Sequence, residues 1–160
     1  MKYLASLQKN EFMRNFTFLI IAFLIFSCGS DEEIYSLAME DEVLEIINEH
    51  RNSLGLKSLK MNQTILEESR IHSCNMANGI TPFGHDGFGA RLKRIKAKIG
   101  GGGGSENVAW GYHSAQSVVN GWLTSSGHKK NIEGNHDITG IGICRGNNGG
   151  IYYTQIFMKE

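Results

Sequence analysis

Residues 118–132 read VVNGWLTSSGHKKNI. The apolar side chains of this stretch and of the residues just before it recur at helical spacing, at Ala115, Val118, Val119 and Trp122. This period predicts an amphipathic helix over residues 114–123, with one face packed on the core of the protein. Gly127 then gives the backbone freedom to turn, so that the side chain of His128 can point into a cleft.

Three segments upstream of this stretch also have a helical period. The first covers residues 40–53, and the second begins after Asn62, a residue type that caps helices, and ends before Gly79. The third covers residues 87–99, where basic side chains surround an apolar face and are predicted to be solvated. These basic residues are Arg91, Lys93, Arg94, Lys96 and Lys98.

The C-terminal part of the chain changes to a strand-like pattern. Ile138–Cys144 and Ile151–Met158 are rich in β-branched and aromatic residues, and they flank the sequence NNGG at 147–150. Such a glycine-rich connection between two apolar runs is a strong hairpin signal. Helices followed by an antiparallel pair of strands predict an α+β fold in layers.

The composition sets limits on the class of protein. The chain has 160 residues, of which 41% are hydrophobic, with 16 basic and 16 acidic side chains. This suits one compact domain and excludes an intrinsically disordered chain. The neutral balance lacks the broad positive charge of a nucleic-acid-binding protein, so no nucleic-acid partner is predicted. Nothing in the sequence indicates a particular oligomeric state.

The N-terminal residues are predicted to direct export. Residues 16–26 read FTFLIIAFLIF, eleven residues without charge. This is the length of a signal-peptide core, whereas a membrane-spanning helix needs roughly 20 apolar residues. The run ends at IFSC (25–28), which resembles a bacterial lipoprotein signal whose cysteine, here Cys28, is lipidated and becomes the mature N-terminus. An ordinary secretory signal, with Cys28 incidental, is the alternative.

The predicted organisation follows from this signal. Residues 1–27 are a lipoprotein-type signal peptide, residues 28–39 a tether and residues 40–160 the folded domain. The mature protein is exported and held in the cell envelope by the lipid anchor, and the acidic SDEE after Cys28 resembles tags for the outer surface. Cys74 and Cys144 remain as an even pair in an oxidising compartment. The sequence is compatible with a disulfide between these two cysteines and equally with two separately buried thiols.

Polar residues beside glycine turns are the candidates for chemistry. They are His85 in FGHDGFG, Glu106 and Asn107 in GSENVAWG, and His128. Two imidazoles and one carboxylate can hold zinc with a position left open for water. The separations of 21 and 22 residues match no local ligand motif, so three ordinary hydrogen-bonding loop residues are the alternative. The sequence contains no GxSxG, HExxH or CxxC motif.

Six segments in order give a more specific resemblance, which covers roughly residues 40–158. They read HSCNMA, PFGHDGFGARLKRI, GSENVAWG, VVNGWLTSSGHKKNI, ITGIGI and IYYTQIF. Together they resemble the CAP superfamily, which comprises cysteine-rich secretory proteins, antigen 5 and plant pathogenesis-related proteins, also called SCP-like domains. The order Trp-x-x-Ser-x-Gly-His is similar to the short bacterial branch. The resemblance implies an α-β-α sandwich around a small antiparallel sheet.

The resemblance also implies a cleft in which His85, Glu106 and His128 converge. Several animal members of the family have a second acid in this set and can hold a divalent metal there. Ser125 stands at the position of that acid, as in the bacterial branch, so a metal such as zinc would need water to complete its ligands. Gln155 matches the family motif in the last strand and could border the cleft or be buried.

Three functions are therefore open. The favoured one is a binding or interaction module whose cleft accepts a lipid, a peptide or a cell-wall fragment, with no required cofactor. The second is a metal-dependent hydrolase or peptidase with His85 and His128 as ligands and Glu106 as ligand or general base. The third is a structural envelope protein. The missing nucleophile motif and the missing second acid favour binding over catalysis.

Overall fold

The computed structural model describes the backbone of residues 27–160 and the side chains from Tyr35 onward. The predicted signal peptide and the side chain of Cys28 lie outside that part. The chain divides into the compact units Met1–Tyr35 and Ser36–Glu160, and the layers described below belong to the second unit. No helix within the described residues is both long and apolar enough to cross a membrane.

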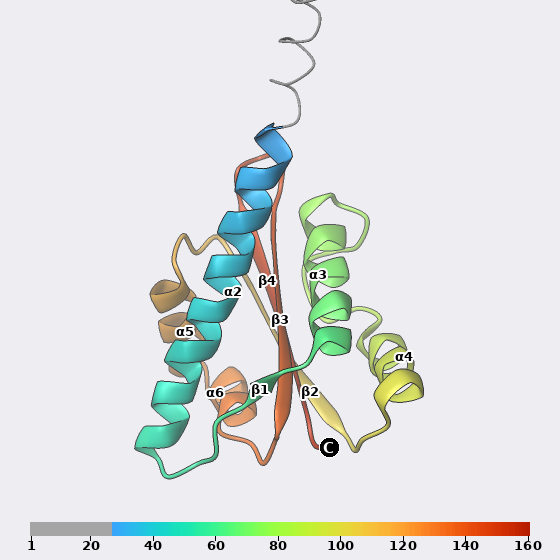
Figure 1. The fold of residues 1–160 in the computed structure, drawn as a ribbon. Helices are drawn as coiled ribbons and strands as arrows, with labels where there is room; N and C mark the ends of the chain where they lie inside the picture. The colour runs from blue at the N-terminus through green and yellow to red at the C-terminus, as the bar shows by residue number, and fades with distance from the viewer. Residues whose placement is uncertain (1–26) are drawn as a thin grey trace, which may run out of the picture. The chain divides into compact units, whose positions relative to one another are not determined.

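The helices and strands follow the predicted order (Figure 1). The elements are α2 (Ser27–Ser53), β1 (Lys60–Met61), α3 (Gln63–Ala77), α4 (Phe88–Ile99), β2 (Gly104–Trp110), α5 (Ala115–Thr124), α6 (Ser126–Ile132), β3 (Ile138–Arg145) and β4 (Ile151–Met158). The segment 28–39, predicted as a tether, is helical and belongs to α2. Residues 30–53 contain neither glycine nor proline, so nothing in them breaks the helix.

A short helix separates from α5 and was not predicted. Ser125 has an extended backbone, with φ −94° and ψ 118°, and this single residue divides α5 from α6. His128 consequently lies on a helix and not in a loop.

The sheet has the strand order β1-β3-β4-β2. β3 and β4 form the predicted hairpin, and β2 pairs antiparallel with β4. The two-residue β1 adds one parallel contact to β3. Mixed helices around a small, mainly antiparallel sheet confirm the predicted α+β fold. Because β2 pairs with β4 alone within this sheet, it forms one edge.

Two apolar layers cover the two faces of the sheet (Figure 1). Successive side chains of a strand point to opposite faces, so β4 contributes to both layers. Phe157 packs with residues of α2 and α5, whereas Ile156 packs with residues of α3 and α4. The helices thus form the outer layers of an α-β-α sandwich.

Helix α3 approaches β3 more closely than side chains would allow. A Cβ atom placed on Gly140 would overlap the backbone of Leu66, and one on Gly142 would overlap the backbone of Arg70. Two serines of α3 use this closeness, since the Oγ of Ser69 donates to Gly140 O at 3.1 Å and that of Ser73 donates to Gly142 O at 2.8 Å. The glycines at alternate positions of β3 therefore provide a flat surface for a helix backbone.

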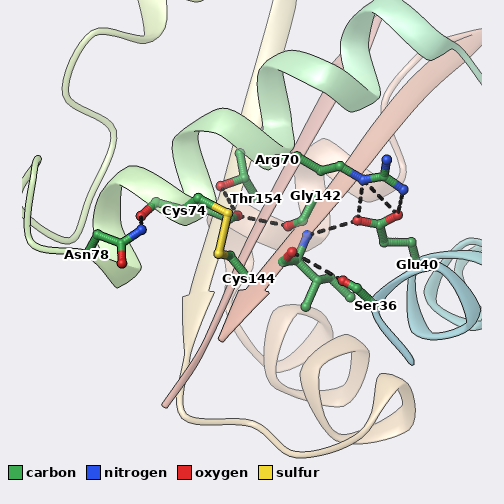
Figure 2. Close-up of a disulfide and its surroundings, with 10 residues drawn as sticks. Ser36, Glu40, Arg70, Cys74, Asn78, Gly142, Cys144 and Thr154 are labelled. Atoms are coloured by element: carbon green, nitrogen blue, oxygen red, sulfur yellow. Dashed lines mark hydrogen bonds and ion pairs between the residues drawn. A yellow bond between two sulfur atoms is a disulfide. The ribbon is translucent and has the colours of Figure 1, made fainter. Parts of the chain in front are cut away.

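A disulfide joins the same two elements. Cys74 of α3 and Cys144 of β3 are paired, with their Cα atoms 5.0 Å apart and a sequence separation of 70 (Figure 2). Of the two alternatives left open by the sequence, the structure has the disulfide. Glu40 of α2 is buried and accepts from Arg70 of α3 and from Ile143 N of β3. The disulfide and the hydrogen bond from Ile143 N thus tie β3 to its neighbouring helices, and the ion pair ties these two helices to each other.

The close approach of α3 to β3 predicts a large effect of a single methyl group. Gly142→Ala should lower the free energy of unfolding by about 1–3 kcal/mol or more, because the new Cβ pushes the helix from the strand. Gly89→Ala is the matched control, since a Cβ on Gly89 in α4 meets open space; this change should be neutral or stabilising. Urea unfolding measures both, and equal stabilities would contradict the prediction.

Candidate functional site

The carboxylate of Glu106 lies at the centre of a buried ion pair. Glu106 is in β2, and its side chain is 1% exposed. Oε1 accepts from Arg91 Nη2 at 2.9 Å and from His85 Nδ1 at 3.0 Å. Oε2 accepts from Arg91 Nε at 3.0 Å and from Nη2 at 2.8 Å. Four contacts match the roughly four lone-pair positions of a carboxylate, so this group is fully engaged.

Arg91 corrects the predicted solvated face of α4. Its side chain is only 6% exposed, and it also donates from Nη1 to Asp86 O at 2.7 Å. A signal for this burial was present in the sequence, because Arg91 precedes the buried Ile95 by four residues and shares its side of the helix. Arg94 is 52% exposed, as predicted, and also pairs with Glu68 of α3.

His85 is oriented from two sides. An ionised carboxylate only accepts hydrogen bonds, so Nδ1 of His85 carries the proton that it donates to Glu106. The preceding carbonyl, Gly84 O, accepts from Nε2 of His72 at 2.9 Å. Burial lowers the pKa of His72, and the nearby charges of Arg91 and His85 lower it further against the opposing effects of the Gly84 contact and Glu106. A buried histidine in α3 therefore fixes the backbone that presents His85, whose side chain is 52% exposed.

Asn107 points to the opposite face of β2 from Glu106. It is completely buried, and its Nδ2 donates to His128 O at 3.2 Å. Asn131 of α6 donates to Asn107 Oδ1 at 2.9 Å and to Glu106 O at 3.3 Å. The amide pair thus fixes α6, and with it His128, against the edge of the sheet.

His128 lies in a pocket beside this edge. The pocket has a volume of about 300 Å³, and we call it the His128 pocket. It is lined by Phe83, Val108, Ala109, Trp110, Tyr112, Gly121, Trp122, Ser125 and His128. Burial lowers the pKa of His128 and the charge of His85 lowers it further, which favours the neutral imidazole. Of the predicted cleft residues, Ser125 and His128 line this pocket.

Gln155 lies beneath the surface. It is completely buried in β4, where its Nε2 donates to Thr139 Oγ1 at 3.2 Å. Its Oε1 has no hydrogen-bond partner, a feature shared with only a few buried side-chain atoms of the described chain. The structure places it between Asn107 and Ile141 in the sheet, in the buried position that was one of its two expected roles.

The residues predicted as a metal set are brought only partly together. His85 contacts Glu106 through its side chain, whereas His128 is held through its backbone carbonyl, which accepts from Asn107. From Tyr35 onward, no group of three or more His, Cys, Asp or Glu side chains is arranged to hold a metal ion. The four contacts of Glu106 also leave its carboxylate no position for a cation. These residues therefore do not fit a three-ligand metal site.

Aromatic side chains at the pocket were not predicted as site residues. Trp110, at the end of β2, is 53% exposed, and Phe83, in the loop before α4, is 56% exposed. Tyr152 lies opposite Trp110 in the sheet, and its ring centroid is 6.2 Å from that of Trp110 and 6.5 Å from that of Phe83. A signal was present, because the strand alternation places Trp110 on the face of Glu106 beyond the end of α3.

Comparison with known proteins agrees with this architecture. The model of the cysteine-rich secretory protein family, CAP, matches residues 44–157. The chain belongs to the CAP family. This stretch contains the sheet except Met158, the disulfide and every residue of the His128 pocket, so the family match includes the candidate site.

Bacterial CAP proteins are among its relatives. An uncharacterized protein of Bacillus subtilis, YkwD, is 32% identical over 129 residues, which cover 76% of this chain and 48% of the relative. An extracellular SCP-domain protein of Bacillus anthracis superposes with a TM-score of 0.68 at 26% identity, covering 78% of this chain and 41% of that one. An outer surface protein of Borrelia burgdorferi superposes with a TM-score of 0.66 at 23% identity, covering 74% of this chain and 90% of that one. The chain spans about half the length of the first two proteins.

The buried ion pair predicts an asymmetric response to mutation. Arg91→Met should lower the free energy of unfolding by about 3–5 kcal/mol, because it leaves the charge of Glu106 buried without its partner. The double variant Arg91→Met/Glu106→Leu should be more stable than the single one, because both charges are then absent. Lys93→Met, on the exposed side of α4, is the control and should change stability by less than about 0.5 kcal/mol. Denaturant unfolding tests this, and a double variant less stable than Arg91→Met would contradict it.

The buried histidines predict a loss of stability in acid. The pKa of His72 is lower in the folded protein than the unfolded value of about 6.5, so the unfolded chain binds the proton first as the pH falls. This part of the stability is present above pH of about 6.5 and is lost as the pH approaches the folded pKa.

The variant His72→Asn separates titration from packing. Its loss of stability at pH 7.5 reports the packing of the ring, and its smaller further loss between pH 7.5 and 5 reports the missing titration. His128 and His136, whose pKa values are also lowered by burial, remain in both proteins. An identical pH dependence of the unfolding free energy in wild type and variant would show that His72 does not contribute.

Proposed function

We propose that this CAP protein is an exported module, held in the cell envelope by a lipid on Cys28, that binds a ligand in the His128 pocket without transforming it. The disulfide between Cys74 and Cys144 supports export, because such bonds persist in oxidising compartments. The extracellular and outer-surface proteins that share the fold are consistent with the same location.

One observation carries the binding role. The His128 pocket combines half-exposed aromatic rings with hydroxyl and imidazole groups, and this mixture is typical of sites that hold a small ligand. Large apolar groups exposed together on a protein surface mark interaction sites. Lipid, peptide and cell-wall fragments are the three ligand classes considered for this pocket.

The contacts of Glu106 make a hydrolase less well supported. A general base must be free to take a proton from water, whereas this carboxylate accepts two hydrogen bonds from a guanidinium at Oε2 alone. A divalent metal such as zinc would compete with Arg91 for the same oxygens. Binding in the His128 pocket is accordingly proposed to need no metal.

Filling the pocket tests the binding role. Ser125→Trp should abolish ligand binding, because the indole occupies the space beside His128, while Asn120→Trp on the exposed side of α5 should leave binding intact. Palmitate, a neutral tripeptide and N-acetylchitotriose are titrated into the ¹⁵N-labelled full chain, with and without EDTA. At least one probe should shift the amide signals of pocket residues, equally with EDTA.

Two results would contradict this proposal. One is the absence of any shift with all three probes. The other is a shift that persists unchanged in Ser125→Trp, which would place binding elsewhere on the protein.

A further inference from the structure

We infer that the ligand of the His128 pocket is a neutral saccharide, one ring of which stacks on the indole of Trp110. This inference rests on the proposed binding function and specifies its ligand class. It is carried by the exposed rings, by the absence of charged residues from the lining and by the blocked edge of the sheet.

The exposed rings form a supported platform. Tyr152 contacts both Trp110 and Phe83, with interplanar angles of 41° and 60°, so the two half-exposed rings are supported from one side. Both rings line the pocket. The face of an indole is electron-rich, and the C–H bonds on one face of a pyranose ring are weakly polarised towards it, so the two surfaces attract each other in water.

The charge of the lining selects against ions. None of the nine lining residues is an acid, a lysine or an arginine, and the lowered pKa of His128 keeps its ring neutral at pH 7. An anionic ligand would find no cation in this lining, and a quaternary ammonium would find no carboxylate. Ser125 and His128 instead offer neutral donors and acceptors, which match sugar hydroxyl groups.

The edge of β2 is closed to an added peptide strand. Such a strand would need the outward carbonyl groups of β2. Glu106 O already accepts from Asn131 Nδ2 at 3.3 Å, and Val108 O accepts from Trp122 Nε1 at 3.3 Å. An extended peptide is therefore disfavoured on this face.

A lipid chain also fits this pocket poorly. The hydroxyl of Ser125 and the imidazole of His128 would lose water to a hydrocarbon without gaining a partner, which is unfavourable for each buried group. A volume of about 300 Å³ lies at the lower end of the range for small-molecule sites. It suits one or two sugar rings.

The test follows the sugar protons in N-acetylchitotriose added to the full chain. Stacking on Trp110 should shift the ring C–H resonances of one residue upfield and should transfer saturation to them. Trp110→Ala should remove the upfield shift and weaken binding at least about fivefold, whereas Trp110→Phe should retain part of both. Leu54→Ala is the matched control, because Leu54 is equally exposed, at 53%, after the end of α2.

The outcomes separate this inference from the proposed function. Binding with an upfield shift that Trp110→Ala removes would support it. Equal affinity in Trp110→Ala would overturn it. A second outcome is that chitotriose does not bind, while palmitate or the tripeptide shifts the amide signals of pocket residues and Ser125→Trp removes these shifts. The inferred ligand class is then wrong, and the proposed binding function stands. If none of the three binds, both fall.

Discussion

The contact of α3 with β3 is the constraint on which the other parts of this protein depend. It is a backbone-to-backbone approach, possible because Gly140 and Gly142 have no side chain, and the disulfide from Cys74 to Cys144 closes it at one end. With α3 fixed to the sheet, His72 is fixed too, and through Gly84 O it sets the backbone before His85. The position of an exposed histidine therefore derives from the packing of two glycines more than fifty residues away in sequence.

The edge strand β2 divides the polar residues into two groups with different tasks. Glu106 faces α4 and is engaged by Arg91, whereas Asn107 faces α6 and holds the backbone of His128. Within β2, the charged side chain and the neutral amide therefore point in opposite directions. A buried carboxylate beside a guanidinium depends on this partner, since removing either one alone leaves an unpaired charge. The His128 pocket takes residues from both faces of this edge strand, since Trp110 has the parity of Glu106 and Ala109 that of Asn107.

The sequence was sufficient for the main elements of the fold, because helices, hairpin and family motifs depend on local spacing. It was insufficient where a long-range contact overrides a local preference. Arg91 resembled its solvated neighbours, and only its distance of four residues from Ile95 indicated the buried side of α4. The motif residues His85, Glu106 and His128 were grouped because the family implied one cleft, but the contact of Glu106 with Arg91 and that of Asn107 with the backbone of His128 do not follow from local spacing. Cys74 and Cys144 could be paired only in three dimensions.

The protection of the sheet edge and the formation of the pocket have a common cause. An exposed edge strand is a template for unwanted pairing with other chains, and here Trp122 and Asn131 occupy its outward carbonyl groups. The helices that bring these two side chains, α5 and α6, belong to the layer on one face of the sheet and extend to the edge of β2, where the His128 pocket lies. Trp110 and Phe83 border that pocket on the side where α3 has already ended. An edge closed in this manner cannot recruit a strand, but it can present rings and neutral hydrogen-bonding groups, which is the chemistry that a polar, uncharged ring ligand requires.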